Sequence, residues 1–315
     1  MKTFKKICRK NQLELKAWLY KLLKMKYRKV VCEDGFLYAK GDVPILLTAH
    51  MDTVHKETCK QIVVEKKDGK TIFSSPQGIG GDDRCGIWMI WMILCKTKYR
   101  PYILFCEDEE IGGVGSKKFT KTKYVDDLGK LKYMIELDRA HDKDAVYYDC
   151  GNEDFMDYIK ETTGYTEAYG SFSDISHLSP ASDVASVNLS CGYYNAHTLN
   201  EYVVYEEMFA TYKVVKTLLS KAKECKEYDY QEYTYSRYGN NDYSLWDYYG
   251  YNTFGDTTKS QKTETYEINF KLNGQEEYDW VEAVSYEEAI GILFINYPTI
   301  CYDDIIDWGI VREAV

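Results

Sequence analysis

The sequence predicts an α/β fold: a three-layer sandwich with a mainly parallel central sheet flanked by helices, followed by a small α+β C-terminal module. Three observations predict it. Through the first two-thirds of the chain, apolar runs of strand length alternate with helical segments, which is typical of a parallel sheet covered by helices. Chemically active side chains follow several of these strands, and near residue 226 the composition becomes Tyr-rich and acidic. With 315 residues, 45% of them apolar, the chain can bury one large core and carry an extension.

The first 40 residues predict a helix and a hairpin. Asn11 and Glu14 have the spacing of a capping box, in which side chain and backbone satisfy each other at a helix start. Five apolar side chains then share one helical face: Leu15, Trp18, Leu19, Leu22 and Met25. Residues 30–38 follow and predict a hairpin that turns at Asp34 and Gly35.

Three later apolar runs predict buried strands, at residues 44–49, 102–106 and 133–137. Residues 87–94 are apolar throughout and predict a buried helix between the first two strands. A last helix, residues 206–221, is expected to close the first domain, residues 1–225.

Each of these strands is followed by acidic or imidazole side chains. His50 follows the first strand, and Asp52 lies two residues further on, where its carboxylate can accept the other N–H of the imidazole. Glu109 and Glu110 follow the second strand, and Asp138 follows the third. Because side chains at the carboxyl ends of parallel strands meet at one edge of the sheet, we expect these five residues to gather there.

Three further candidates come from turns. Asp82 and Asp83 lie in a Gly-rich turn before the apolar helix. The alternative interpretation is a helix N-cap, and both can hold, because free backbone N–H groups also orient a carboxylate. His197 lies late, in the run from Cys191 to Tyr202. The remaining histidines match no motif position and are interpreted as structural or close to substrate: His55, His141 and His177.

In this order the motifs resemble those of the co-catalytic dizinc exopeptidases, which include peptidase T-like, compact and tetrahedral aminopeptidases. Those enzymes have a His-x-Asp motif, a bridging Asp in a Gly-x-Asp-Asp-(Lys/Arg)-x-Gly turn, a Glu-Glu pair, an Asp and a late His. The resemblance spans roughly residues 30 to 220 and implies that His50, Asp82 and Asp138 bind one metal ion. It implies that Asp82, Glu110 and His197 bind a second ion.

The residue types suit this chemistry on their own. Two cations about 3.5–4 Å apart need a bridging carboxylate, and they lower the pKa of a bound water towards ~7 while polarising a carbonyl. Imidazole and carboxylate ligands favour Zn²⁺, with Mn²⁺ and Co²⁺ as alternatives. The resemblance further implies that Glu109 is the general base and that Asp52 orients His50.

Larger relatives carry inserted domains that this chain has no room for. His50 and Asp82 are 32 positions apart, and Asp138 and His197 are 59 apart, too few for a lid or dimerisation domain of about 100 residues. We therefore expect residues 1–225 to form a dinuclear-metal hydrolase domain without that insertion. Residues 173–177 are interpreted as a loop of the substrate pocket.

Residues 226–254 contain nine tyrosines and show no sustained helical or strand period. Residues 226–262 are therefore interpreted as a tethering linker, or alternatively as a segment that recognises a protein partner, since Tyr supplies contact area with few rotors. Residues 263–315 predict a small acidic α+β module. In it, residues 266–272 alternate as a strand, Asn273 and Gly274 turn the chain, and Ser285 opens a helix that ends before Pro298.

Charge and cysteine content limit the cellular location and the binding partners that we expect for this protein. Residues 226–315 carry 6 Lys/Arg and 18 Asp/Glu, a net charge of −12, whereas residues 1–225 carry +2. Residues 1–30 contain 11 Lys/Arg, which we interpret as the solvent-exposed face of a helix. The sequence lacks the combination of aromatic and basic residues that is typical of nucleic-acid binding. Ten cysteines at irregular spacing favour reduced thiols in the cytoplasm. No segment predicts a signal peptide or membrane insertion.

These observations predict a metal-dependent exopeptidase, an aminopeptidase or dipeptidase that hydrolyses short peptides with two divalent ions. Two alternatives on the same fold are an amidohydrolase that deacylates N-acyl amino acids and an aminoacyl cyclotransferase. An alternative of another class is a non-catalytic binding protein that uses the Tyr-rich tail, with a protein partner or self-association. The complete set of ligand positions together with Glu109 argues against that last alternative.

Overall fold

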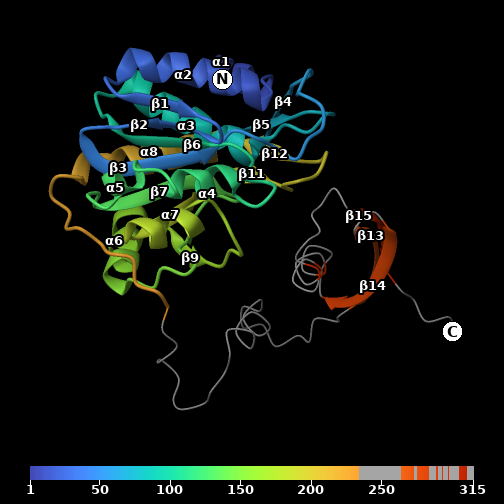
Figure 1. The fold of residues 1–315 in the computed structure, drawn as a ribbon. Helices are drawn as coiled ribbons and strands as arrows, with labels where there is room; N and C mark the ends of the chain where they lie inside the picture. The colour runs from blue at the N-terminus through green and yellow to red at the C-terminus, as the bar shows by residue number, and fades with distance from the viewer. Residues whose placement is uncertain are drawn as a thin grey trace. The chain divides into compact units, whose positions relative to one another are not determined.

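The computed structural model describes residues 1–233, 264–272, 275–283 and 305–310, together with Ala289, Leu293 and Tyr297. The chain divides into two compact units, Met1–Asn240 and Asn241–Val315 (Figure 1).

Helices and strands alternate along the first unit. Its helices are α1 (Lys2–Cys8), α2 (Gln12–Lys26), α3 (Gly81–Lys96), α4 (Val114–Thr120), α5 (Val125–Leu128), α6 (Glu153–Thr163), α7 (Ile175–Ser182) and α8 (Tyr205–Lys221). Its strands are β1 (Val30–Glu33), β2 (Phe36–Ala39), β3 (Val43–His50), β4 (Val63–Lys67), β5 (Lys70–Ser74), β6 (Pro101–Cys106), β7 (Tyr133–Arg139), β8 (Asp144–Val146), β9 (Thr166–Ala168), β10 (Ser186–Ser190), β11 (Tyr193–Tyr194) and β12 (Tyr202–Val204).

An eight-stranded sheet forms the centre of this unit, in the order β1-β2-β6-β3-β7-β10-β8-β9. The pairs β3–β6, β3–β7, β7–β10 and β8–β9 are parallel, whereas β1–β2, β2–β6 and β8–β10 are antiparallel. The predicted α/β fold with a mainly parallel sheet is confirmed. The predicted hairpin is confirmed as β1 and β2, which extend the sheet at one edge.

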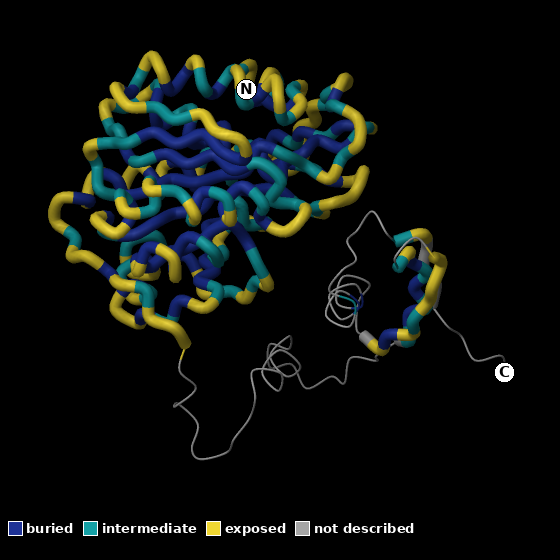
Figure 2. Tube along the Cα trace, viewed as in Figure 1, coloured by how far each residue is buried: buried dark blue, intermediate teal, exposed yellow. Residues whose placement is uncertain are grey.

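Helices cover both faces of the sheet, which confirms the three-layer sandwich. On β3, Leu47 belongs to an apolar cluster with residues of α1, α2, α3 and α8, whereas the adjacent Leu46 belongs to a second cluster with residues of α4, α5 and α7. Successive side chains of a strand point to opposite faces, so the two groups of helices lie on opposite sides. Figure 2 shows the central strands buried between these layers.

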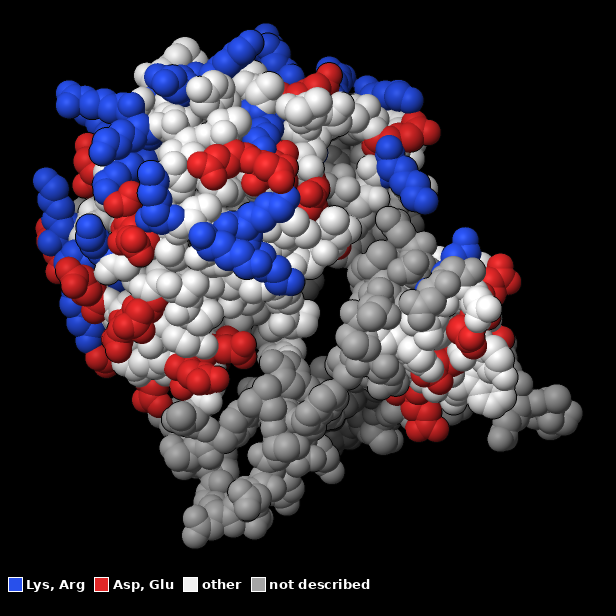
Figure 3. Space-filling model, in the orientation of Figure 1, with Lys and Arg blue, Asp and Glu red and all other residues white. Residues whose placement is uncertain are grey.

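The predicted opening helix is confirmed as α2. The Asn11 side chain accepts the backbone N–H of Glu14 at 2.9 Å, and the Glu14 carboxylate accepts that of Asn11 at 3.3 Å. Met25 is 73% exposed, because ten residues turn it about 80° away from Leu15. Lys and Arg gather over α1 and α2 along the upper surface in Figure 3.

A second, four-stranded antiparallel sheet, β11-β12-β5-β4, lies outside the sequence prediction. Its strand β12 pairs with β5 through Val203 opposite Phe73, both fully buried. The loop between β11 and β12 carries His197. The second sheet therefore anchors the segment that brings this histidine to the first sheet.

Residues 226–233, which the sequence analysis places in the linker, pack along the first unit. The Tyr228 N–H donates to the carbonyl of Lys132, and the Tyr228 carbonyl accepts the N–H of Ala185, both at 2.9 Å. The Tyr228 side chain is buried and stacks on Tyr158 at 5.4 Å between ring centroids. The first unit therefore continues past residue 225, the predicted end of the catalytic domain.

A truncation series tests this boundary. We expect a chain that ends at Asn240 to fold, and a chain that ends at Ala222 to melt about 5–10 °C lower, because it loses Tyr228, worth about 1.5–3 kcal/mol. Thermal unfolding followed by circular dichroism measures the difference. Equal melting temperatures would contradict the packing role of Tyr228, and an insoluble chain ending at Asn240 would contradict the independence of the first unit.

The second unit contains a three-stranded antiparallel sheet, in the order β14-β13-β15. Its strands are β13 (Glu264–Leu272), β14 (Gln275–Ala283) and β15 (Ile305–Ile310). One face is apolar, with Tyr266, Ile268 and Phe270 of β13 buried beside Val281 of β14, as the predicted alternation requires. The expected turn at Asn273 and Gly274, the helix from Ser285, Pro298 and residues 234–262 lie outside the described residues.

None of the helices in the described ranges is long and apolar enough to cross a membrane.

Candidate metal centre

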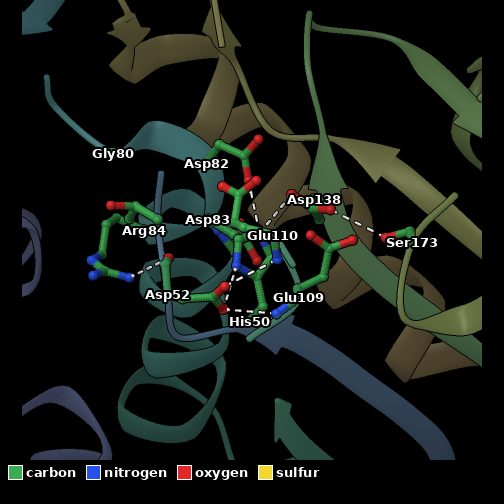
Figure 4. A network of polar contacts seen from close by, with 12 residues as sticks. His50, Asp52, Gly80, Asp82, Asp83, Arg84, Glu109, Glu110, Asp138 and Ser173 are labelled. Atoms are coloured by element: carbon green, nitrogen blue, oxygen red, sulfur yellow. Dashed lines mark hydrogen bonds and ion pairs between the residues drawn. The ribbon is translucent and has the colours of Figure 1, made fainter. Parts of the chain in front are cut away.

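The predicted site residues come from several segments that meet at one edge of the central sheet. His50 is the last residue of β3 and pairs in register with Cys106, the last residue of β6. Asp138 lies on β7, next to β3 on its other side. Since these strands are parallel, the loop after β6 that carries Glu109 and Glu110 begins beside His50. In Figure 4 the carboxylates of Glu109, Glu110 and Asp138 lie around a common space with His50.

His50 is fully buried and contacts three carboxylates. Its Nε2 lies 2.8 Å from Asp82 Oδ1 and 3.4 Å from Asp138 Oδ1, and its Nδ1 lies 3.2 Å from Asp52 Oδ1. Asp52 also accepts the backbone N–H groups of Glu109 at 3.1 Å and Glu110 at 3.0 Å. Asp52 thus holds the imidazole through Nδ1, which leaves Nε2 as the ligand atom, and also holds the Glu-Glu turn.

Asp82 lies between the two histidines. His197 Nε2 lies 3.2 Å from Asp82 Oδ2 and 3.1 Å from Glu110 Oε2. The side chain of His197 is 49% exposed, whereas those of Asp82, Glu110 and His50 are 11%, 8% and 0% exposed. The site is therefore open to solvent on the side of His197.

The described residues contain two groups of side chains whose ligand atoms lie within 4.8 Å of one another: His50 with Asp83 and Asp138, and His50 with Asp82 and Glu110. Asp83 is an addition to the ligands implied by the resemblance. Its Oδ1 accepts the N–H of Gly86 at 2.8 Å, which is the helix-capping role given above as the alternative interpretation. Asp83 can have both roles, because Oδ1 caps the helix and Oδ2 is left for a cation.

Gly86 allows α3 to approach β7 closely. A Cβ atom on Gly86 would lie 2.0 Å from the carbonyl oxygen of Leu137, on the strand that carries Asp138. A larger residue would push the start of α3, with Asp82 and Asp83, away from Asp138.

The buried oxygens of the site fit a divalent cation. Asp83 Oδ2 and Glu110 Oε1 are inaccessible to solvent and accept no hydrogen bond. Asp138 Oδ1 is also inaccessible, and its polar neighbour is His50 Nε2 at 3.4 Å. A buried carboxylate oxygen without a hydrogen bond is costly, so a cation among these oxygens would be stabilising. Two imidazoles with four carboxylates make a donor set suited to Zn²⁺, Mn²⁺ or Co²⁺.

The pKa values of these groups reflect their crowding. Burial, together with Asp82, raises the pKa of Asp138 to about 8. Hydrogen bonds to Asp82 and Glu110 raise the pKa of His197 to about 11. Burial opposes ionisation of Asp82, but hydrogen bonds with His197 and His50 hold the pKa of Asp82 well below its usual range. Near neutral pH, protons thus occupy Asp138 and His197.

A cation bound by these residues must displace those protons. We expect metal binding at about pH 7 to release protons, and the affinity to rise about tenfold or more per pH unit between about pH 6 and 7, below the pKa values of Asp138 and His197. Calorimetric titration in two buffers of different ionisation enthalpy measures the release. An affinity independent of pH in this range would contradict the assignment of these two ligands.

Glu109 borders the same space without a place in either group of ligand atoms. Burial and the nearby carboxylates of Asp138, Asp174 and Glu110 raise the pKa of Glu109 well above its usual value. A carboxylate with a raised pKa beside a metal site is suited to accept and return a proton. Two further buried acids are not among the predicted site residues, Asp174 in the predicted pocket loop and Glu136 on β7, and burial also raises the pKa values of both.

The loop predicted to line the substrate pocket reaches the site. Ser173 Oγ donates to Asp138 Oδ2 at 3.2 Å, as Figure 4 shows. His177 lies on the first turns of α7, where its Nδ1 is 3.1 Å from Ser116 Oγ and its ring packs against Phe172. His141 is separate, paired with Asp144 at 3.3 Å.

Comparison with known proteins gives structural matches alone: no protein-family model matches the chain, and no curated protein matches its sequence. The aminopeptidase PepT from Bacillus cereus is 17% identical with a TM-score of 0.55, over 70% of this chain and 97% of that chain. A tripeptidase from Staphylococcus aureus is 13% identical with a TM-score of 0.57, over 71% and 97%.

A third match is the TET1 peptidase from Pyrococcus horikoshii, which can assemble into a tetrahedron or a large octahedral shell. It is 13% identical with a TM-score of 0.52, over 68% of this chain and 97% of that chain. The resemblance drawn from the motifs is confirmed as a shared fold with these peptidases.

Proposed function

We propose that this protein is a metal-dependent exopeptidase, an aminopeptidase or dipeptidase that hydrolyses short peptides. The observation that carries the proposal is the meeting of two imidazoles and four carboxylates at one sheet edge, with unpartnered buried oxygens directed at the same space. The shared fold with an aminopeptidase and a tripeptidase supports the choice of peptides as substrates.

Five residues would hold the two ions. His50, Asp82 and Asp138 would bind one, and Asp82, Glu110 and His197 the other, which agrees with the distances around Asp82. Asp83 would lie beside the first ion, with His50 and Asp138. Zn²⁺ is the first choice for this donor set, with Mn²⁺ and Co²⁺ as alternatives.

When bound, two divalent cations supply Lewis acidity for the carbonyl and acidify the attacking water. The residues of the chain then move the proton. The Glu109 carboxylate would accept the proton of the water and return it to the departing amine nitrogen, so that one peptide bond and one water become a carboxylic acid and an amine. Asp52 keeps His50 and the Glu109 backbone in place.

Substrate would enter on the exposed side of His197. Between Asp138 and His197 the structure has the sheet and helix elements from β8 to β11, which belong to the first unit itself. No inserted lid lies among the described residues of this interval. Ser173, bonded to Asp138, would lie at the wall of the substrate pocket.

Location and assembly are also proposals. All nine cysteines in the described ranges are free, which supports a reducing compartment such as the cytoplasm. Self-association, or a protein partner for the Tyr-rich segment, stays a prediction.

A substrate screen tests the proposed reaction. Protein loaded with Zn²⁺, Mn²⁺ or Co²⁺ is incubated with dipeptides, tripeptides, aminoacyl amides and N-acyl amino acids, and the released amine is measured. We expect hydrolysis of the peptides, abolished in a Glu109→Gln control. Turnover of N-acyl amino acids alone would establish a deacylase, and cyclised products a cyclotransferase. Metal binding without any turnover would support the non-catalytic binding protein.

A further inference from the structure

A buried carboxylate outside the proposed ligand set contacts the loop that carries Asp82. Glu201, 0% exposed, lies just before β12. Its Oε1 accepts the backbone N–H of Asp82 at 3.0 Å, and its Oε2 accepts that of Gly80 at 2.9 Å. Both N–H groups precede the helical part of α3, so no helical carbonyl is available to them. The Glu201 carboxylate, from a distant part of the chain, accepts a hydrogen bond from each of these N–H groups.

His55 completes this contact. Its Nε2 lies 2.8 Å from Glu201 Oε2, and its side chain is 8% exposed. The ring lies against Gly78, where an added Cβ atom would be 2.2 Å from the His55 Cε1 atom. Gly78 has a φ of +82°, a conformation that favours glycine. The segment after β3 and the loop before α3 are therefore interlocked.

Glu201 and His197 belong to one short segment. The Glu201 N–H donates to the carbonyl of Thr198 at 3.1 Å, which closes a turn between them. The segment thus reaches Asp82 twice: His197 Nε2 lies 3.2 Å from the Asp82 carboxylate, and Glu201 holds the Asp82 backbone. Both contacts therefore converge on Asp82, which lies between His50 and His197.

We propose that Glu201 and His55 are positioning residues that fix the Asp82 carboxylate for divalent cations. Neither side chain is a ligand or touches the reacting atoms. The inference rests on the proposed function, because it concerns the bridging role of Asp82. Residues outside the ligand set that orient metal ligands typically contribute 10–100-fold in metal affinity.

Metal titration of the full-length wild type and three variants tests the proposal. Chelator-stripped wild type, Glu201→Gln, His55→Ala and His55→Gln are titrated with Zn²⁺ and with Mn²⁺ by calorimetry. We expect Glu201→Gln and His55→Ala to raise Kd about 10–100-fold. His55→Gln should restore much of the affinity, because its amide N–H can replace Nε2–H as a donor to Glu201. The matched control is Glu206→Gln, whose carboxylate accepts the backbone N–H of Thr71 at 2.7 Å away from the site, and it should stay within about twofold.

Three further outcomes decide the interpretation. In the double variant His55→Ala/Glu201→Gln, the loss should be close to that of the larger single loss, because both residues act through one contact. Unchanged metal affinity in Glu201→Gln and His55→Ala, with a lower melting temperature alone, would overturn the proposal and leave a purely structural contact. If the wild type itself binds no metal, the proposed function fails, an outcome distinct from failure of this inference.

Discussion

Replacing Glu109 with Gln is expected to lower kcat by about 10²–10⁴, the usual contribution of a general base, while both metal ions stay bound. Gln has nearly the same shape but cannot accept a proton from the attacking water. Glu109 is partly buried near Asp138 and Glu110, and no ligand group includes it. Steady-state kinetics with a dipeptide, together with elemental analysis of the purified variant, measure the two quantities.

The adjacent variant Glu110→Gln is the matched control. Its carboxylate lies 3.1 Å from His197 Nε2 and has an unpartnered oxygen within the ligand group. We expect this variant to bind metal more weakly. Loss of metal from Glu109→Gln with full retention in Glu110→Gln would reverse the two roles.

Replacing Asp82 with Asn is expected to have the second largest effect. Asp82 lies within hydrogen-bond reach of both His50 and His197. One substitution should therefore weaken the binding of both proposed ions. Loss of the charge stabilisation that a cation supplies, several kcal/mol, corresponds to a decrease on the order of 10³-fold in kcat/KM. Metal content and peptide hydrolysis are measured on the same preparation.

Asp83→Asn is the comparison for that variant. Asn keeps an oxygen that can cap α3 through the N–H of Gly86, so the fold should be preserved. We expect a smaller decrease in metal affinity, about 10–100-fold, because Asp83 groups with His50 and Asp138, whereas Asp82 lies within hydrogen-bond reach of both histidines. A complete loss of metal in Asp83→Asn, with normal binding in Asp82→Asn, would make Asp83 the bridging residue.

The sequence predicts the layers and the gathering of site residues because these depend on local patterns. Residues 44–49 are apolar except for Thr48, as a strand covered on both faces is expected to be, and β3 has that environment. Once β3, β6 and β7 are parallel, His50, Glu110 and Asp138 have to meet at one edge.

What the sequence does not predict depends on distant contacts. In the sequence, Glu201 is an acidic residue in a polar loop without a distinguishing pattern. Its proposed role depends on the N–H groups of Gly80 and Asp82, about 120 positions earlier in the chain. Strand β4 is mostly exposed and charged, so it lacks the apolar signal, although Asp68 and Gly69 give a turn signal. Tyr228 looks like part of the Tyr-rich segment, and only its pairing with Lys132 and Ala185 places it in the core.

Metal stoichiometry tests the central claim most directly. After loading with Zn²⁺ or Mn²⁺ and removal of excess ion, elemental analysis should give about two ions per chain. At a free metal concentration of about 100 times Kd, binding adds about 2.7 kcal/mol of stability, so chelation should abolish hydrolysis and lower the melting temperature by about 5–10 °C. A loaded protein that contains no metal, and whose activity and melting temperature are unaffected by chelator, would contradict the account.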